Sequence, residues 1–320
     1  MEVKKYYKDI DLIRLFSCIA VLLYHLNILK GGYLAVCIFF VISGYLSCVS
    51  LFKKNKISLK DYYKNRLIKL YLPLLIVVFV SISIISLFPS INWFNLKNET
   101  TSVLLSYNNF WQLSANLDYF QRHTSSPFMH FWYISNLFQF DLVFPFIYMF
   151  IRKIESKTNK YFVCALSIIV SIVSTIYFYI VSLNGNVMFT YYNTFSRIFS
   201  LLFGVSLGLV HSYFGNIVPS YITKNSTKNK VITAYLFLLT YLFIFIDGSF
   251  KYSAISMISV SLISCRLIEY ATMDDDTNLN IFRKIVKSLS SISYEIYLIQ
   301  YPVIFLFQSL NLQGMEVVII

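Results

Sequence analysis

The sequence has few charged residues for its length. Only 13% of its 320 residues are charged, and 57% are hydrophobic, whereas a soluble domain carries about 25% charged residues. One soluble core cannot take up this excess, because a core must be wrapped in a polar surface. The deficit therefore excludes an ordinary soluble protein and predicts an all-α, polytopic bundle of transmembrane helices.

Cysteine is also scarce. The five cysteines all fall in apolar stretches, and the sequence has no CxxC pair and no cluster of cysteine with histidine. Isolated cysteines in such stretches are typical of small buried side chains. We therefore expect neither a disulfide framework nor a metal site.

Nine apolar segments approach the length of about 20 residues that a bilayer-spanning helix needs. They are residues 12–29, 33–52, 70–89, 128–150, 161–182, 195–212, 230–247, 252–270 and 290–308. The final letters, GMEVVII, resemble the start of a tenth span. The sequence predicts nine to ten spans in one integral membrane domain over residues 1–320, with an incomplete final span and no appended soluble domain.

The lysines and arginines are distributed unevenly between the segments that connect these spans. With the N-terminus placed in the cytoplasm, 22 of the 27 fall on the inner side. Positive residues favour the cytoplasmic side of membrane proteins, so we expect a multi-pass protein of the cell membrane with a cytoplasmic N-terminus. The net charge of +12 then reflects topology and contact with anionic lipid, not nucleic-acid binding.

Arg14 and His25 are ionisable residues of the first apolar segment. Eleven residues correspond to about three helical turns and about 16 Å, so both side chains point the same way. An arginine at the membrane surface can bind phosphate, and a histidine deeper in can accept a proton from a hydroxyl. Asp11 is placed to pair with Arg14. The alternative is a structural histidine and an arginine that only sets topology.

Arg66 and Lys69 follow the second span in the stretch DYYKNRLIKLYLP. Three residues apart, they share one helix face. A basic, aromatic helix at the cytoplasmic surface can bind the phosphates of a nucleotide-like donor, or it can lie on anionic lipid.

Further polar residues interrupt the fourth and sixth spans. His130 and Trp132 stand at the outer end of the fourth span, Asp141 lies about three turns deeper, and Arg197 begins the sixth. Charge inside a bilayer is costly, so we expect Asp141 to be paired, protonated or next to water, and Arg197 to meet an acid or a substrate hydroxyl. These four residues and Asp11 are candidates for orienting donor or acceptor. Trp132 and the aromatic, amide-rich loop at 90–127 are expected to face a glycan, although aromatics also suit the membrane interface.

Five stretches together resemble the membrane acyltransferase-3 family of bacterial O-acyltransferases. In chain order they are DLIRLFSCIAVLLYHL, GYLAVCIFFVISGYLSC, YYKNRLIKLYLP, HFWYISNLFQFDLVFP and SYEIYLIQYPVIF. The resemblance extends over the whole chain. It implies a ten-span fold and transfer of an acyl group, usually acetyl from acetyl-CoA, to a surface glycan or its lipid-linked precursor. It also implies that His25 is catalytic and that Arg14 and Arg66 handle the donor.

The sequence departs from the family pattern at several positions. Lys69 stands where a second arginine is usual and loses bidentate geometry. The acidic position before Gln-Phe is Leu137 or Phe138, and Asp141 stands where tyrosine is common. Gln300 replaces a common histidine. These changes raise the hypothesis that Asp141 supplies the missing carboxylate from another turn. They also leave open a degenerate relative that senses or scaffolds.

Two function classes are consistent with this pattern. The first is a membrane-bound O-acetyltransferase that uses acetyl-CoA as co-substrate and no metal, and that modifies a capsular or similar polysaccharide. It would act directly or with a separate extracytoplasmic esterase-like partner. The second is a glycan flippase or polymerase without acyl chemistry, for which the Arg14/His25 stripe and the Arg66/Lys69 motif are not required.

Overall fold

The computed structural model describes residues 7–53, 58–88, 95–116, 126–218, 225–246, 250–273 and 281–310, and this part of the chain contains helices and no strands. The first half comprises α1 (Lys8–His25), η1 (Gly32–Leu34), α2 (Ala35–Phe52), α3 (Leu59–Arg66), η2 (Leu67–Tyr71), α4 (Leu72–Ile85), α5 (Leu96–Leu104) and α6 (Asn108–Ser114). The second half comprises η3 (Met129–Phe131), α7 (Trp132–Lys157), α8 (Lys160–Leu183), α9 (Val187–Tyr192), α10 (Thr194–Phe214), α11 (Asn225–Phe245), α12 (Phe250–Ala271), α13 (Ile281–Ser291) and α14 (Ser293–Ser309). The all-α prediction is confirmed for these residues.

Seven helical segments of the described chain are long and apolar enough to cross a membrane. They are Gly32–Phe52, Leu59–Ile85, Met129–Lys157, Lys160–Leu183, Val187–Phe214, Thr227–Phe245 and Ser253–Ala271. Seven of the nine expected spans coincide with them. The other two coincide with α1, which carries four charged residues near its start, and α14, which has 17 residues. A span count above seven and a cytoplasmic N-terminus stay predictions, and the expected tenth span lies outside the described residues.

Asparagine side chains begin several of the helices. Asn159 accepts a hydrogen bond from the Phe162 N–H at the start of α8, and Asn193 accepts one from Phe195 at the start of α10. Such caps satisfy N–H groups that have no partner inside the helix. The Arg66/Lys69 motif lies where α3 passes through the π-helical turn η2 into α4, a local widening that is common at functional sites.

Close glycine contacts hold α2 and α10 together. A Cβ on Gly44 would lie 2.1 Å from the Leu201 carbonyl oxygen, and one on Gly204 would lie 2.1 Å from that of Val41. Small residues allow such close helix approach in membranes, so these glycines serve packing.

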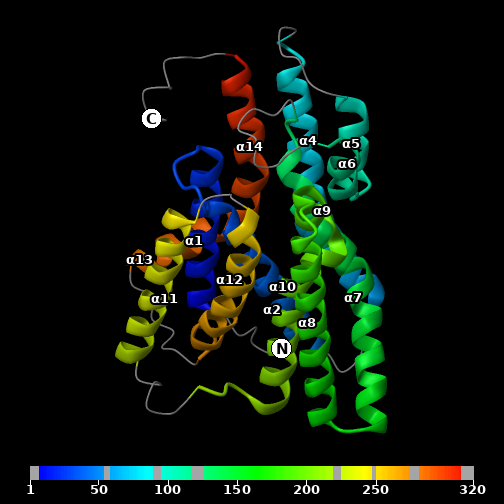
Figure 1. Ribbon diagram of the computed structural model, residues 1–320, viewed down its shortest axis with the longest axis vertical. Coiled ribbons are helices and arrows are strands. Elements are labelled where there is room, and N and C mark those ends of the chain that lie inside the picture. The colour runs from blue at the N-terminus through cyan, green and yellow to red at the C-terminus, as the bar shows by residue number, and fades with distance from the viewer. Residues whose placement is uncertain are drawn as a thin grey trace.

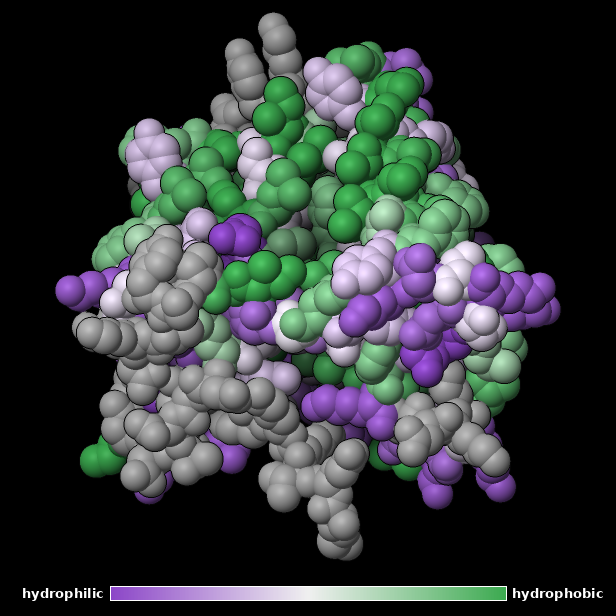
Figure 2. Space-filling model, turned by 90° about the horizontal axis from the view of Figure 1, so that it is seen from below, coloured by the Kyte–Doolittle hydropathy of each residue, from purple (hydrophilic) through white to green (hydrophobic). Residues whose placement is uncertain are grey.

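The remaining helices are arranged around this pair (Figure 1). The long helices α7 and α8 run side by side and connect at the lower end of the view, whereas α4, α5, α6 and the far end of α14 lie at the opposite end. Seen from below, hydrophilic side chains form a band across the molecule with hydrophobic side chains beside it (Figure 2). In this arrangement α1 and α14 lie next to each other, and a thiol–carbonyl contact joins Cys18 to Ser293.

Candidate functional site

His25 is the last residue of α1 and lies in a cluster of aromatic rings. Its side chain is 8% exposed. The ring centroid is 4.8 Å from that of Tyr301 on α14 and 6.3 Å from that of His130 on η3. His130 is in turn 5.4 Å from Tyr301 and 5.5 Å from Tyr297. The fold thus brings the two predicted histidines together, and we call His25, His130, Tyr297 and Tyr301 the ring cluster.

Helix α14 holds His130 in this cluster. The Tyr297 hydroxyl donates to the His130 carbonyl oxygen at 2.8 Å, and His130 Nε2 lies 3.2 Å from the Leu298 carbonyl oxygen. His130 Nδ1 is buried and has no hydrogen-bond partner among the described residues. A ring that donates from Nε2 to a carbonyl keeps Nδ1 as an acceptor, which is the form a proton acceptor needs.

Arg14 lies in the N-terminal half of α1 and forms the expected pair with Asp11. Its Nη1 atom is 3.8 Å from Asp11 Oδ1, which also accepts a hydrogen bond from Ser290 on α13 at 3.2 Å. The Arg14 side chain is 36% exposed. Tyr133 on α7 lies close enough to interact electrostatically with Arg14, and its ring is 5.4 Å from Tyr297. Tyr133, in the electrostatic surroundings of Arg14, thus contacts the ring cluster through Tyr297.

Arg66 forms an ion pair with Asp141. Its Nη2 atom is 3.1 Å from Asp141 Oδ1 and donates to Ser47 Oγ at 2.7 Å. The Tyr62 hydroxyl donates to the same carboxylate oxygen at 3.1 Å. The arginine side chain is 30% exposed, and that of the aspartate 3%. The expected partner of Asp141 is thus the motif arginine itself.

The turn that lacks the acidic residue of the family contributes packing instead. Leu137 is buried, and the Phe138 ring lies 5.7 Å from that of Tyr71. Asp141, one turn further along α7, is the carboxylate that meets Arg66. Lys69 is exposed within η2, and Gln300 is buried on α14 beside Tyr301.

Arg197 is fully buried among aromatic rings. Its guanidinium carbon lies 5.8 Å from the ring centroid of Phe40, 5.4 Å from that of Trp132 and 5.1 Å from that of Tyr191. Its nitrogens also contact Met257 Sδ and Cys37 Sγ. The expected acid does not appear among its described partners, and Arg197 is stabilised by cation–π contacts. Trp132 is fully buried against this guanidinium rather than on the loop surface.

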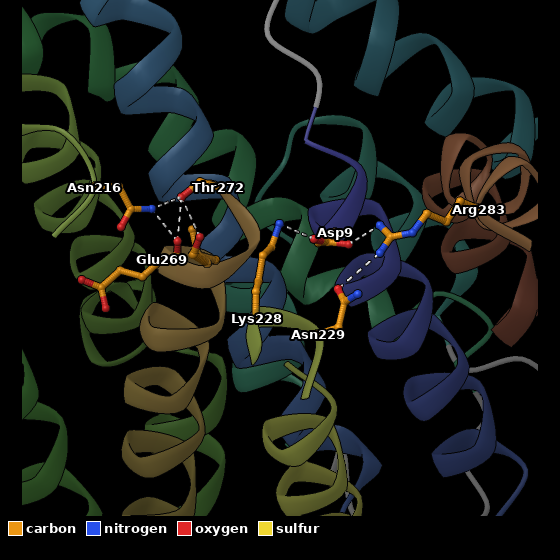
Figure 3. A network of polar contacts seen from close by, with 8 residues as sticks. Asp9, Asn216, Lys228, Asn229, Glu269, Thr272 and Arg283 are labelled. Carbon is orange, nitrogen blue, oxygen red and sulfur yellow. Dashed lines mark hydrogen bonds and ion pairs between the residues drawn. The ribbon is translucent and has the colours of Figure 1, made fainter. Parts of the chain in front are cut away.

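A buried charge network, not predicted from sequence, ties α1 to α11 and α13 (Figure 3). Asp9 Oδ2 is 2.8 Å from Lys228 Nζ, and Asp9 Oδ1 is 2.6 Å from Arg283 Nη1. Nearby, Asn216 donates to the Glu269 carbonyl oxygen. The signal in the sequence was an acid at the start of an apolar helix, but its partners come from more than 200 residues away.

The two tyrosines of the ring cluster were also missed. Tyr297 and Tyr301 belong to the stretch SYEIYLIQYPVIF, which already carried the family resemblance. Their spacing of four residues places them on one face of α14, a signal that was available without coordinates.

The arrangement combines two part-exposed arginines, Arg14 on α1 and Arg66 at the end of α3, with a buried ring cluster at the C-terminal end of α1. Arginines suit a phosphate-bearing ligand, and a buried neutral imidazole suits proton transfer. Among the described residues, no group of three or more His, Cys, Asp or Glu side chains could hold a metal ion.

Comparison with known families defines the class. The sequence profile described as an acyltransferase domain matches residues 7–317, so the chain belongs to the membrane acyltransferase-3 family. It is 26% identical over 330 residues to O-acetyltransferase OatA of Staphylococcus aureus strain NCTC 8325, covering 97% of this chain and 52% of the relative. A second protein of S. aureus strain COL, curated as a candidate O-acetyltransferase, is 29% identical over 213 residues, covering 64% of this chain and 35% of the relative.

The chain spans about half the length of OatA and about a third of the second relative. No solved structure matches it.

Proposed function

We propose that this protein is a membrane O-acetyltransferase that moves acetyl from cytoplasmic acetyl-CoA to a hydroxyl of a cell-surface polysaccharide or its lipid-linked precursor. The observation that carries the proposal is the row of side chains between Arg14 and His25. Tyr133 lies in the electrostatic surroundings of Arg14, its ring contacts that of Tyr297, and Tyr297 belongs to the ring cluster with His130. The Arg14 end of this row suits the charged phosphates of a long donor, and the His25 end suits its reacting thioester.

The proposed donor enters at the arginine end. Arg14 and Arg66 are both part-exposed, and Lys69 is exposed, so all three can reach the phosphates of coenzyme A from solvent. Each arginine is paired with an acid. The acid balances the positive charge of the guanidinium when no donor is bound. The acetyl-bearing arm then extends toward His25, about 16 Å away along α1.

The predicted orientation places this entrance in the cytoplasm. The connection between α7 and α8 lies at the lower end of Figure 1. The helix ends beside this connection carry Arg152, Lys153, Lys157 and Lys160, and the surface seen from that end has a hydrophilic band (Figure 2). Basic residues on one end support a cytoplasmic assignment for it.

His25 acts in the proposal as the general base. The acceptor hydroxyl attacks the thioester carbonyl while the imidazole takes its proton; the new C–O bond forms, the C–S bond breaks, and the imidazolium returns the proton to the departing thiolate. If the imidazole attacks first, it carries the acetyl group briefly and the hydroxyl attacks in a second step. Both routes require a neutral His25 with access to donor and acceptor.

The acceptor approaches from the end where His130 lies. His130, Trp132 and Arg197 are proposed to order this side, with Trp132 and Arg197 as a rigid wall rather than as a surface contact. The curated names of the relatives support acetyl as the group and oxygen as its acceptor. A polysaccharide of the capsular kind is the proposed acceptor, acetylated directly or with a separate esterase-like protein.

The test is transfer by the purified protein in vesicles. Radiolabelled acetyl-CoA is supplied on the Arg14 side and glycan oligosaccharides on the other, and ester-linked label is counted. We expect label on the glycan, and its loss in His25→Ala. In cells lacking the protein, we expect surface glycan without its ester groups. Loss of the entire glycan would instead support a flippase or polymerase.

A further inference from the structure

Glu99 is a buried carboxyl outside the membrane-spanning helices. It lies on α5 and is 0% exposed. Its Oε1 atom accepts hydrogen bonds from the Ser126 hydroxyl, from the Gln112 side-chain amide at 3.3 Å and from the Phe128 backbone N–H at 3.2 Å. One carboxyl oxygen thus joins α5, α6 and the segment that leads into α7.

That segment also carries His130. Phe128 immediately precedes η3 and accepts the hydrogen bond of the Phe131 N–H at 3.0 Å, and its ring stacks on that of Phe131 at 5.5 Å. The turn that begins at Phe128 therefore fixes the backbone of His130. Because Glu99 holds the Phe128 N–H, the position of His130 depends on Glu99.

The surroundings of Glu99 contain more acceptors than donors. Glu99 Oε2, Asn108 Oδ1 and Gln112 Oε1 are all buried without a hydrogen-bond partner in the described part of the chain. The described groups that face Glu99 from α5, α6 and residues 126–128 are amides, hydroxyls and backbone, with no charged side chain among its contacts. A proton on the carboxyl turns one surplus acceptor into a donor.

Burial favours that protonated form. Desolvation raises the pKa of Glu99 to about 8 from its ordinary 4.5, against the opposing effect of the hydrogen bonds from Ser126, Phe128 and Gln112. A carboxyl with a raised pKa stabilises the fold fully below about 4.5, and its contribution is lost as pH rises through about 8. Above that pH the turn that carries His130 adjoins a buried carboxylate with hydrogen-bond donors but no cation among its described contacts.

We infer that Glu99 is a positioning residue for the transfer reaction, and that as a neutral acid it holds the Phe128–Phe131 turn and so places His130 against His25. This inference rests on the proposed function. It adds a residue that contacts neither the ring cluster nor the arginines, and it makes transfer sensitive to pH on the side of the membrane where α5 and α6 lie.

The experiment compares wild type, Glu99→Gln and Glu99→Ala in vesicles whose pH is varied from 6 to 9 on the α5/α6 side only. We expect wild-type kcat to fall as the pH rises through about 8. Glu99→Gln keeps a neutral group of the same shape, so we expect its rate at pH 7 within about twofold of wild type and no such alkaline fall. Glu99→Ala leaves the turn unheld, and misplacement of a reacting group costs on the order of a hundredfold, so we expect a loss of that order in kcat.

His123, which lies outside the described residues, is a titratable group three positions before Ser126 in sequence, so His123→Gln serves as the control. A retained alkaline fall in Glu99→Gln, or its disappearance in His123→Gln, overturns the inference. An inactive but folded Glu99→Gln, judged by thermal unfolding in detergent, overturns it as well. A wild-type protein that transfers no acetyl at any pH contradicts the proposed function instead, and the two failures are thus distinguished.

Discussion

Arg14 and His25 lie on the same helix, yet the side chains around them differ in charge and exposure. The region of Arg14 and Arg66 is charged and part-exposed, and each guanidinium is paired with an acid. The ring cluster around His25 consists of two histidines and two tyrosines, all buried. About 16 Å of helix separates them.

The difference indicates a division of tasks. An arginine that reaches solvent forms only a weak ion pair with a neighbouring acid. A phosphate can therefore replace the acid and the bound water at a small cost in free energy. Proton transfer benefits from the opposite environment, because electrostatic interactions strengthen where water is excluded. We expect variants at the arginine end to change donor affinity, and variants in the ring cluster to change the rate of the chemical step.

We expect the largest effect on acetyl transfer from a substitution in the ring cluster. His25→Ala removes the proposed proton acceptor, and general bases contribute about 10²- to 10⁴-fold. We expect kcat for acetyl transfer to fall by that factor, with little change in KM for acetyl-CoA, measured with labelled donor. His211→Ala is the matched control, because His211 bonds Tyr45 at 3.3 Å elsewhere in the bundle. Equal losses in both variants would remove the distinction between the ring cluster and a histidine elsewhere in the bundle.

The next largest effect concerns the buried charge network of Asp9, Lys228 and Arg283, which we expect to contribute to stability and not to catalysis. Asp9→Asn leaves the Lys228 ammonium buried without its anion, and breaking a buried pair costs about 3 kcal/mol or more. We expect a clear drop in the unfolding temperature in detergent. Exposed Asp61→Asn, at the start of α3, should cost under about 1 kcal/mol. A stable Asp9→Asn protein with a raised KM would place Asp9 in the donor site instead.

Variants of Arg66 test whether the arginine region binds the donor. Arg66→Gln removes a charged hydrogen-bond donor, and such bonds contribute about 1.5–3 kcal/mol, so we expect KM for acetyl-CoA to rise about tenfold to a hundredfold. The double variant Arg66→Gln with Asp141→Asn avoids a buried unpaired carboxylate and should show the same rise. Arg152→Gln, which breaks an exposed pair with Glu155, is the control. A normal KM in the double variant would mean that Arg66 only neutralises Asp141.

The smallest effect is expected at Lys69. An exposed lysine is screened by salt, so Lys69→Ala should raise KM for acetyl-CoA by about twofold to threefold at low ionic strength, with no effect at about 1 M salt. Exposed Lys157→Ala should leave KM unchanged at either salt concentration. A salt-independent loss would show that Lys69 makes a direct, desolvated contact.

Periodicity and hydropathy predicted most of the helices because lipid requires each span to satisfy its own backbone hydrogen bonds. The expected spans at 33–52 and 161–182 nearly coincide with α2 and α8. The Asp11–Arg14 pair was also predictable, because residues three apart on a helix are neighbours. The predicted first and last spans coincide with α1, which combines charged with apolar residues, and with α14, which has 17 residues.

The partners of isolated polar residues were not predictable. Arg197 was expected to meet an acid or a substrate hydroxyl, and among the described residues it lies in an aromatic cage drawn from α2, α7 and α9. Asp141 meets an arginine 75 positions earlier, and Glu99 holds a turn 29 residues later. Such contacts depend on helix rotation and neighbour choice, about which a single sequence carries no local signal.

By itself the sequence determined that this chain is helical, that most of it can reside in lipid, and that Arg14 and His25 lie on one stripe. Local backbone geometry and the low solubility of apolar segments in water are enough for those conclusions. Only the tertiary structure decided that His25 meets His130 and Tyr301 and that Arg66 meets Asp141. Those pairs form between separate helices, and the packing of side chains across helix interfaces selects them.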